Sequence, residues 1–420
     1  MELSVAGDGG GGEWFYLHDL DGIQDLIEAE GDGEVVELQS RVMDEDGLYL
    51  LLWLMDEVGH RIVTVELARN TVYTERGWHT LADCLLHDNC RVTQLAIPCA
   101  PPALCKVFNS PICTITGVQV CGAKPNSLPL LGAILQSRQV RSLTVYEEMD
   151  PRVFDGFTDL IPSAHLSRLK ISLFEETKPQ YPYFLAQACA APYISILNLD
   201  GSLLGNNDAM ELAKFLPISH ISSLSVAFCS IGELGIQALC DQISRDISLV
   251  RELDVSFNNI GDNIGAMALA RAVLFGKLQV LRARECHIES IGALELATAL
   301  GSSSLKEVDL SYNQLRDGFV PVLALALQQP TCHIRVLDVR CCALSNQALL
   351  YHLPKALLHI NCQLDQVHLG KRLDGVSRYI HLTRNLLTVV SAHQVRRLGT
   401  ASALKRLPKD LARLVGMSLV

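Results

Sequence analysis

Charged and aromatic residues recur every 27 to 29 positions in the second half of the chain. The ten that we single out are Glu252, Asp254, Phe257, Arg282, Arg284, Glu307, Asp309, Tyr312, Asp338 and Arg340. Carboxylates beside guanidinium groups form ion pairs, and aromatic rings with arginine dominate the energy of many protein interfaces. These residues therefore predict a protein-binding surface, with Phe257 and Tyr312 as its anchors.

A second interpretation of the same residues stays open. Asp254, Arg282 and Asp309 follow one another at the repeat spacing, so their charges can neutralise each other across neighbouring strands. In that case the surface is only a solvated face. The residues alone do not choose between the two interpretations.

Known catalytic patterns are absent from the sequence. It contains no G-x-x-x-x-G-K-[ST] phosphate loop, no G-x-S-x-G elbow and no H-E-x-x-H zinc motif. The thirteen histidines are scattered, and neither Cys286-His287 nor Cys332-His333 has a further ligand at metal spacing. We therefore expect no enzyme activity, no cofactor and no metal site.

The elements that position the charged residues are short apolar triplets of the form L-x-x-L-x-L. They read Ile194/Leu197/Leu199, Ile221/Leu224/Val226, Val250/Leu253/Val255, Leu278/Leu281/Ala283, Leu305/Val308/Leu310, Ile334/Leu337/Val339 and Leu364/Val367/Leu369. Alternation within each triplet predicts a strand whose apolar residues point inward, as for Leu253 and Val255. Segments at helical spacing follow, so each unit is one strand and one helix. Such units bury their apolar faces only by stacking.

The turn after each strand carries an alternating residue: Cys229, Asn258, Cys286, Asn313 and Cys342. With units of 27 to 30 residues, this alternation resembles the ribonuclease-inhibitor-like subfamily of leucine-rich repeat proteins. The resemblance is specific over residues 194–370 and implies an α/β horseshoe solenoid, with a parallel β-sheet on the concave face and helices on the convex face. It also implies binding at the concave face. That face is mixed in charge, so ribonuclease is not supported as the ligand.

The repeats continue toward the N-terminus with irregular spacing. Residues 62–370 are predicted to hold about twelve units, irregular before 194, and Pro98, Pro101 and Pro102 argue against a regular helix start after the second strand. Residues 1–61 are predicted to be an acidic tail and capping segment. Residues 371–420 are predicted to be a basic helical cap.

The charge and the cysteines of the chain restrict which partners it can bind and in which cellular compartment it is expected. The net charge is −11, residues 1–90 hold 20 acidic and 4 basic side chains, and residues 371–420 hold 2 and 10. Net acidity argues against nucleic acid as the partner of the repeats, and no apolar run is long enough for membrane insertion. The start of the chain lacks a signal peptide, so the fourteen cysteines indicate reduced thiols and a cytoplasmic location.

The sequence therefore predicts a non-catalytic scaffold or adaptor that binds a protein through the concave face. Three alternatives stay open. The Asn70-Thr71-Val72 turn beside Arg69 resembles an early unit of Ran-type GTPase-activating proteins, which would make Arg69 a candidate for stabilising phosphoryl transfer. Residues 407–420 resemble the opening helix of an F-box, which implies a ubiquitin-ligase adaptor, through Leu407, Pro408, Leu411 and Leu414. A cytoskeletal or flagellar scaffold is the third. Partner identity and oligomeric state are not readable from the sequence.

Overall fold

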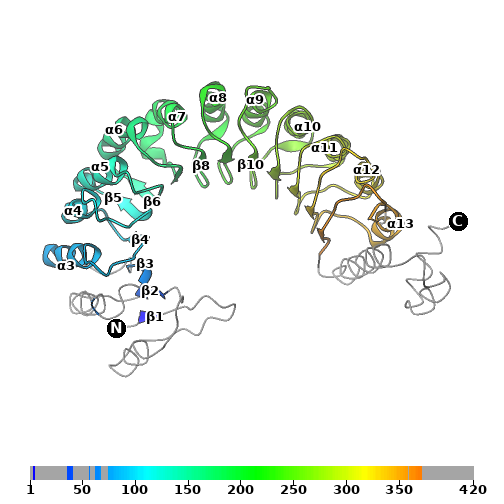
Figure 1. The fold of residues 1–420 in the computed structure, drawn as a ribbon. Helices are drawn as coiled ribbons and strands as arrows, with labels where there is room; N and C mark the ends of the chain where they lie inside the picture. Colours follow the sequence, from blue (N-terminus) through cyan, green and yellow to red (C-terminus); the bar gives the residue numbers. More distant parts are fainter. Residues whose placement is uncertain are drawn as a thin grey trace, which may run out of the picture. The chain divides into compact units, whose positions relative to one another are not determined.

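The computed structural model describes residues 3–4, 36–40, 56, 62–67, 74–357 and 359–370. The chain divides into two compact units: Met1–Leu203 with Ile218–Ile221, and Leu204–Pro217 with Ser222–Val420. In each unit, short strands alternate with helices along the chain, and the strands lie on one side and the helices on the other (Figure 1).

The first unit contains a sheet whose strands follow sequence order. Its strands are β1 Leu3–Ser4, β2 Val36–Ser40, β3 Ile62–Glu66, β4 Gln94–Ile97, β5 Gly117–Ala123, β6 Ser142–Met149, β7 Arg168–Ile171 and β8 Ile196–Asn198. Strand β1 pairs antiparallel with β2, and β2 to β8 pair in parallel. The parallel order is what stacked strand–helix units produce.

The helical layer of the first unit is irregular. Its α-helices are α3 Glu75–Leu85, α4 Cys105–Phe108, α5 Leu128–Gln136, α6 Pro151–Leu160 and α7 Tyr181–Ala190. Four 3₁₀ turns accompany them: η2 Pro102–Leu104, η3 Pro125–Ser127, η4 Ile161–Ser163 and η5 Glu175–Gln180. After β4, the chain enters only a 3₁₀ turn and the four-residue helix α4, in agreement with the effect expected of Pro98, Pro101 and Pro102.

The second unit is the regular part of the solenoid. Its strands are β9 Ser223–Ser225, β10 Glu252–Asp254, β11 Val280–Arg282, β12 Glu307–Asp309, β13 Val336–Asp338 and β14 Gln366–His368, all paired in parallel in that order. Its helices are α8 Gly205–Phe215, α9 Glu233–Ile243, the π-helix η7 Gly261–Gly265, α10 Ala266–Phe275, α11 Ser290–Leu300, α12 Phe319–Ala326 and α13 Asn346–Leu357. The 3₁₀ turn η6 Leu216–Ile218 follows α8.

The triplets form the core, as the alternation predicts. Val250, Leu253 and Val255 are each at most 1% exposed, whereas Glu252 between them is exposed. The expected α/β leucine-rich-repeat solenoid is thus confirmed. Twelve strands, β3 to β14, lie within the described part of residues 62–370. The predicted boundaries at 61 and 370 adjoin residues outside the described part, so they stay a prediction.

The asparagines of the turn connect neighbouring units. The side-chain oxygen of Asn258 accepts the backbone amides of Cys229 at 3.1 Å and Ile231 at 2.9 Å. Its nitrogen donates to the carbonyls of Val226 and Val255 at 2.7 and 2.9 Å. Asn313 repeats this pattern two units later. Both side chains are 2% exposed, so these backbone groups of the turn are satisfied without water.

The alternating cysteines make fewer contacts than the asparagines. The thiol of Cys286 donates to the carbonyls of Val255 and Arg284, both at 3.3 Å, and Cys342 does the same to Leu310 and Arg340. A thiol does not accept two amides as a carboxamide does. Each asparagine therefore joins its unit to the preceding one more strongly than each cysteine.

Buried thiols predict a loss of stability at alkaline pH. Burial raises the pKa of Cys84, Cys189, Cys286 and Cys342 from 9.0 to about 12. The unfolded chain releases these protons near pH 9 and the folded chain only near pH 12, so stability is fully present below pH 9 and falls between these values. We expect a loss on the order of 1 kcal/mol per thiol for each pH unit in that window.

Urea unfolding at about pH 8 and about pH 10.5 measures this loss. Cys189→Ala is the matched control, because its pKa is raised by burial alone and its removal takes one thiol from the sum. The variant should lose less stability than the parent between the two pH values. If the variant and the parent lose the same free energy of unfolding between the two pH values, the buried thiols do not govern the alkaline behaviour.

Candidate protein-binding face of the second unit

The predicted binding residues lie in rows across the parallel strands of the second unit. In the sheet register Asp254 is opposite Arg282, Arg282 opposite Asp309, and Asp309 opposite Asp338. Glu252 and Glu307 form a second row, with Val280 between them. The remaining four residues follow the strand ends: Phe257, Arg284, Tyr312 and Arg340. Residues 25 to 30 positions apart in the chain therefore become neighbours on one face, because parallel strands lie about 4.8 Å apart.

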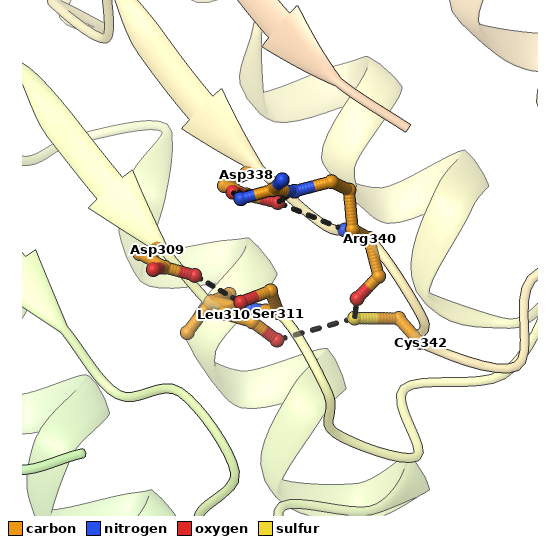
Figure 2. Close-up of polar contacts among 6 residues, drawn as sticks. All are labelled: Asp309, Leu310, Ser311, Asp338, Arg340 and Cys342. Atoms are coloured by element: carbon orange, nitrogen blue, oxygen red, sulfur yellow. Dashed lines mark hydrogen bonds and ion pairs between the residues drawn. The ribbon is translucent and has the colours of Figure 1, made fainter. Parts of the chain in front are cut away.

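Three of the aspartates shape the strand ends. Asp254 accepts the backbone amide of Ser256 and Asp309 that of Ser311, each at 2.9 Å, and Asp338 accepts the amide of Arg340 at 3.0 Å. Figure 2 shows this contact at Asp309 and the carboxylate of Asp338 beside Arg340. An aspartate that accepts the amide two residues on stabilises a turn. These carboxylates thus have a structural task in addition to any role in binding.

Two arginines of the face are paired with carboxylates. Nη2 of Arg282 lies 2.7 Å from Oε1 of Glu307 on the next strand. Nε of Arg340 donates to both oxygens of Asp338, at 3.0 and 2.9 Å, and this hydrogen bonding raises the pKa of Arg340. The sequence suggested Asp254, Arg282 and Asp309 as a neutralising set, and the structure adds Glu307 as the ion-pair partner of Arg282. The longer glutamate side chain reaches across one strand, whereas the aspartates turn back to their own backbone.

After each of the strands β9 to β13, the residue directly before the alternating Cys or Asn adopts a left-handed backbone. We call these five residues the exit row: Phe228, Phe257, Glu285, Tyr312 and Cys341, with φ between 52° and 60°. A left-handed conformation costs an ordinary residue roughly 1–2 kcal/mol, and glycine or asparagine adopts it more readily. The large rings of Phe228, Phe257 and Tyr312 therefore do not favour the local backbone conformation. Their presence is the first indication that this edge of the face has a surface role.

The rings and one arginine form a continuous stack. The rings of Phe228 and Phe257 lie 4.0 Å apart between centroids and 12° from parallel. Cζ of Arg284 lies 5.4 Å from the ring centroid of Phe257 and 4.2 Å from that of Tyr312. These distances are in the range of cation–π interactions. We call Phe228, Phe257, Arg284 and Tyr312 the aromatic–arginine stack. Phe228 is 58% exposed and Tyr312 is 45% exposed, so the stack is open to a partner.

Phe228 is the member of the stack that the sequence analysis did not select. It stands directly before Cys229, as Phe257 stands before Asn258 and Tyr312 before Asn313. An alignment of the units on their turn residues would have found it. Its own strand carries the uncharged residues Ser223 and Ser225 at the outward positions, so no charge pattern marks this unit.

Four further features of the sequence analysis concern metal ions, membrane spans, the turn beside Arg69 and the C-terminal helix. Among the described residues, no group of three His, Cys, Asp or Glu side chains is arranged to hold a metal ion. Every described helix is too short or too polar to serve as a membrane span. Arg69 and the Asn70-Thr71-Val72 turn lie outside the described residues, as do Leu407, Pro408, Leu411 and Leu414.

Sequence comparisons find similarity to a leucine-rich repeat family model and to two kinds of curated protein. A model of the family "Leucine Rich repeat" matches residues 248–270 and 301–318. The chain is 29% identical over 263 residues to the ribonuclease inhibitor of Mus musculus, covering 57% of this chain and 54% of that protein. It is 24% identical over 300 residues to the NACHT, LRR and PYD domains-containing protein 12 of Homo sapiens, covering 68% of this chain and 26% of that one. The chain thus spans about half and about a quarter of these relatives.

Two solved structures also align with the chain. A crystal structure of the yeast Rad7 and Elc1 complex aligns with a TM-score of 0.47 and 12% identity, over 74% of this chain and 76% of that chain. A TLR13 complex with single-stranded RNA aligns with a TM-score of 0.43 and 16% identity, over 74% of this chain and 43% of that chain.

Proposed function

Because the chain is a leucine-rich repeat protein of the ribonuclease-inhibitor-like type, we propose that it is a non-catalytic scaffold or adaptor that binds a protein partner through the strand face of its second unit. The partner would be met in the cytoplasm, on the compositional argument from the cysteines. Glu252, Asp254, Asp309, Asp338 and their neighbours would line the contact. Phe257 and Tyr312 would be its anchors.

The aromatic–arginine stack is the observation that carries this proposal. Exposed rings in left-handed positions lower the stability of the folded chain, and aromatic residues with arginine are the usual hot spots of protein interfaces. Neighbouring ion pairs, such as that of Arg282 with Glu307, would form the polar surroundings of the contact. A solvated face with no partner does not account for rings at these positions.

Affinity capture with mass spectrometry tests the proposal. The bait is the full chain, compared with a Phe257→Asn/Tyr312→Asn double variant. Asparagine suits the positive φ of both positions, so the variant should stay folded. The matched control is Leu325→Asn/Tyr351→Asn, which changes two exposed residues on the helices α12 and α13. We expect the double variant to capture at least tenfold less of one dominant partner than the full chain captures, which corresponds to about 1.4 kcal/mol of binding free energy. The control should retain this partner.

A truncation after Gly370 separates this proposal from an adaptor role of the C-terminal segment. Partners that survive the double variant but disappear with the truncation would transfer the binding function to residues 371–420. Partners that survive both changes would contradict the strand face and the C-terminal segment together.

A further inference from the structure

The aromatic–arginine stack contains one cation without a counter-ion. Arg284 forms no ion pair with any described carboxylate, whereas Arg282 and Arg340 each have one. Its Nε is buried and has no hydrogen-bond partner, and the same holds for Oγ of Ser311 on the adjacent strand. Because Nε is closed to solvent, a ligand would meet the terminal Nη1 and Nη2 groups, which carry the other four N–H donors of the guanidinium.

The carboxylates around Arg284 have other contacts. On the two flanking strands, Asp254 accepts the amide of Ser256 and Asp309 that of Ser311. Glu307 is paired with Arg282. Exposed Glu285, the next residue in the chain, is the remaining negative charge beside the stack. Arg284 is therefore the one arginine of this face without an ion-pair partner among the described residues.

The orientation of Arg284 restricts the ligand. Its Cζ lies 5.4 Å from the ring centroid of Phe257 and 4.2 Å from that of Tyr312, and the N–H donors of a guanidinium point outward in its plane. A planar carboxylate matches such an edge with two parallel hydrogen bonds. A phosphate dianion would meet twice the repulsion from Glu285 that a carboxylate meets. We propose that Arg284, within cation–π distance of Phe257 and Tyr312, is the receptor for an Asp or Glu carboxylate in an extended segment of the partner protein. This inference rests on the proposed protein-binding function.

Phe228 adds a second requirement on the partner. It belongs to the unit of β9 and Arg284 to that of β11, so the two lie two strand spacings, about 10 Å, apart across the sheet. An extended segment in the polyproline II conformation advances about 3.1 Å per residue and presents every third side chain on the same face. An aromatic residue three positions from the acid would then cover Phe228, which is 58% exposed. The recognised pattern is an aromatic residue, two others and an acidic residue.

Peptide titration of the full chain, followed by NMR, tests this pattern. The probe is the acetylated, amidated tetrapeptide Phe-Ala-Ala-Glu, and the signal is the Nε–Hε resonance of Arg284, assigned by its loss in Arg284→Lys. We expect a saturable shift with a millimolar Kd. The Phe-Ala-Ala-Gln peptide should bind about tenfold more weakly, because it cannot accept two charge-assisted hydrogen bonds. Phe228→Asn should weaken the Glu peptide severalfold, and Leu325→Asn should not.

Three results would overturn the inference: equal affinity of the Glu and Gln peptides, tighter binding of a Phe-Ala-Ala-phosphoserine peptide, or no saturable shift. The two proposals fail separately. Peptide binding to the stack, with a protein partner that ignores Phe257→Asn/Tyr312→Asn, would remove the proposed function and leave a carboxylate site. Loss of the partner in that variant, without discrimination between Glu and Gln, would remove only the carboxylate receptor.

Discussion

Replacing Asn258 by alanine should destabilise the second unit by about 3–5 kcal/mol. The substitution leaves the amides of Cys229 and Ile231 and the carbonyls of Val226 and Val255 without this partner in a region closed to water. Each unsatisfied buried group costs about 1–3 kcal/mol, although relaxation recovers part of the sum. Urea unfolding followed by circular dichroism measures the loss.

Cys286→Ala is the matched control for this prediction. It changes the same turn position in the next unit, but removes one thiol that donates weakly to two carbonyls. We expect a loss of about 1 kcal/mol for the cysteine variant. Since stability in a repeat protein is approximately a sum of unit and interface contributions, the asparagine variant should also separate the unfolding transition into two steps. Equal losses for the two variants would contradict the bridging role of the asparagines.

Replacing Gly292 by alanine should destabilise the junction between α10 and α11 by about 2–4 kcal/mol. A Cβ at this position would lie 2.2 Å from the Cβ of Ala266 and 2.6 Å from the backbone oxygen of Asp262. The same Asp262 carboxylate accepts the amides of Glu289, Ile291 and Gly292 at the start of α11, at 3.0, 3.2 and 2.7 Å. Displacing Asp262 therefore adds the loss of a helix cap to the overlap.

Gly318→Ala is the corresponding control. Nothing lies within 4 Å of a Cβ built on Gly318, and its φ of −59° suits any residue. Alanine there should be neutral, or stabilising by up to about 1 kcal/mol, because it restricts the unfolded chain. Thermal unfolding of both variants compares them directly. If Gly292→Ala is as stable as Gly318→Ala, the helices tolerate a wider spacing than the structure implies.

The repeat pattern predicted the fold closely because its signal is local. A strand whose inward positions are Leu253 and Val255, followed by a turn at Asn258, has one stable arrangement once units are stacked. The irregular helical layer after β4 was likewise indicated by three prolines.

The candidate site was predicted less completely. The outward positions of each strand could be assigned by alternation, and Phe257 and Tyr312 were predicted as anchors beyond the strand ends. Phe228 holds the equivalent position in the unit of β9, whose strand carries Ser223 and Ser225 in place of charged residues. The ion pair of Arg282 with Glu307 was not foreseen, since an aspartate and a glutamate at neighbouring positions look equivalent in the sequence.

The sequence by itself determined the period, the inward and outward residues and the alternating turn, because side-chain direction in a strand depends only on position along the chain. The tertiary structure decided that Arg282 and Arg340 form ion pairs and that Arg284 forms none with a described carboxylate. Arg284 lies within cation–π distance of Phe257 and Tyr312, which are 27 and 28 residues away in the chain and belong to the adjacent units. The left-handed backbone of the exit row is found where the chain leaves the strand and enters the turn. Such contacts depend on side-chain length and on the conformation of neighbouring units, and neither is encoded in the spacing of the repeats.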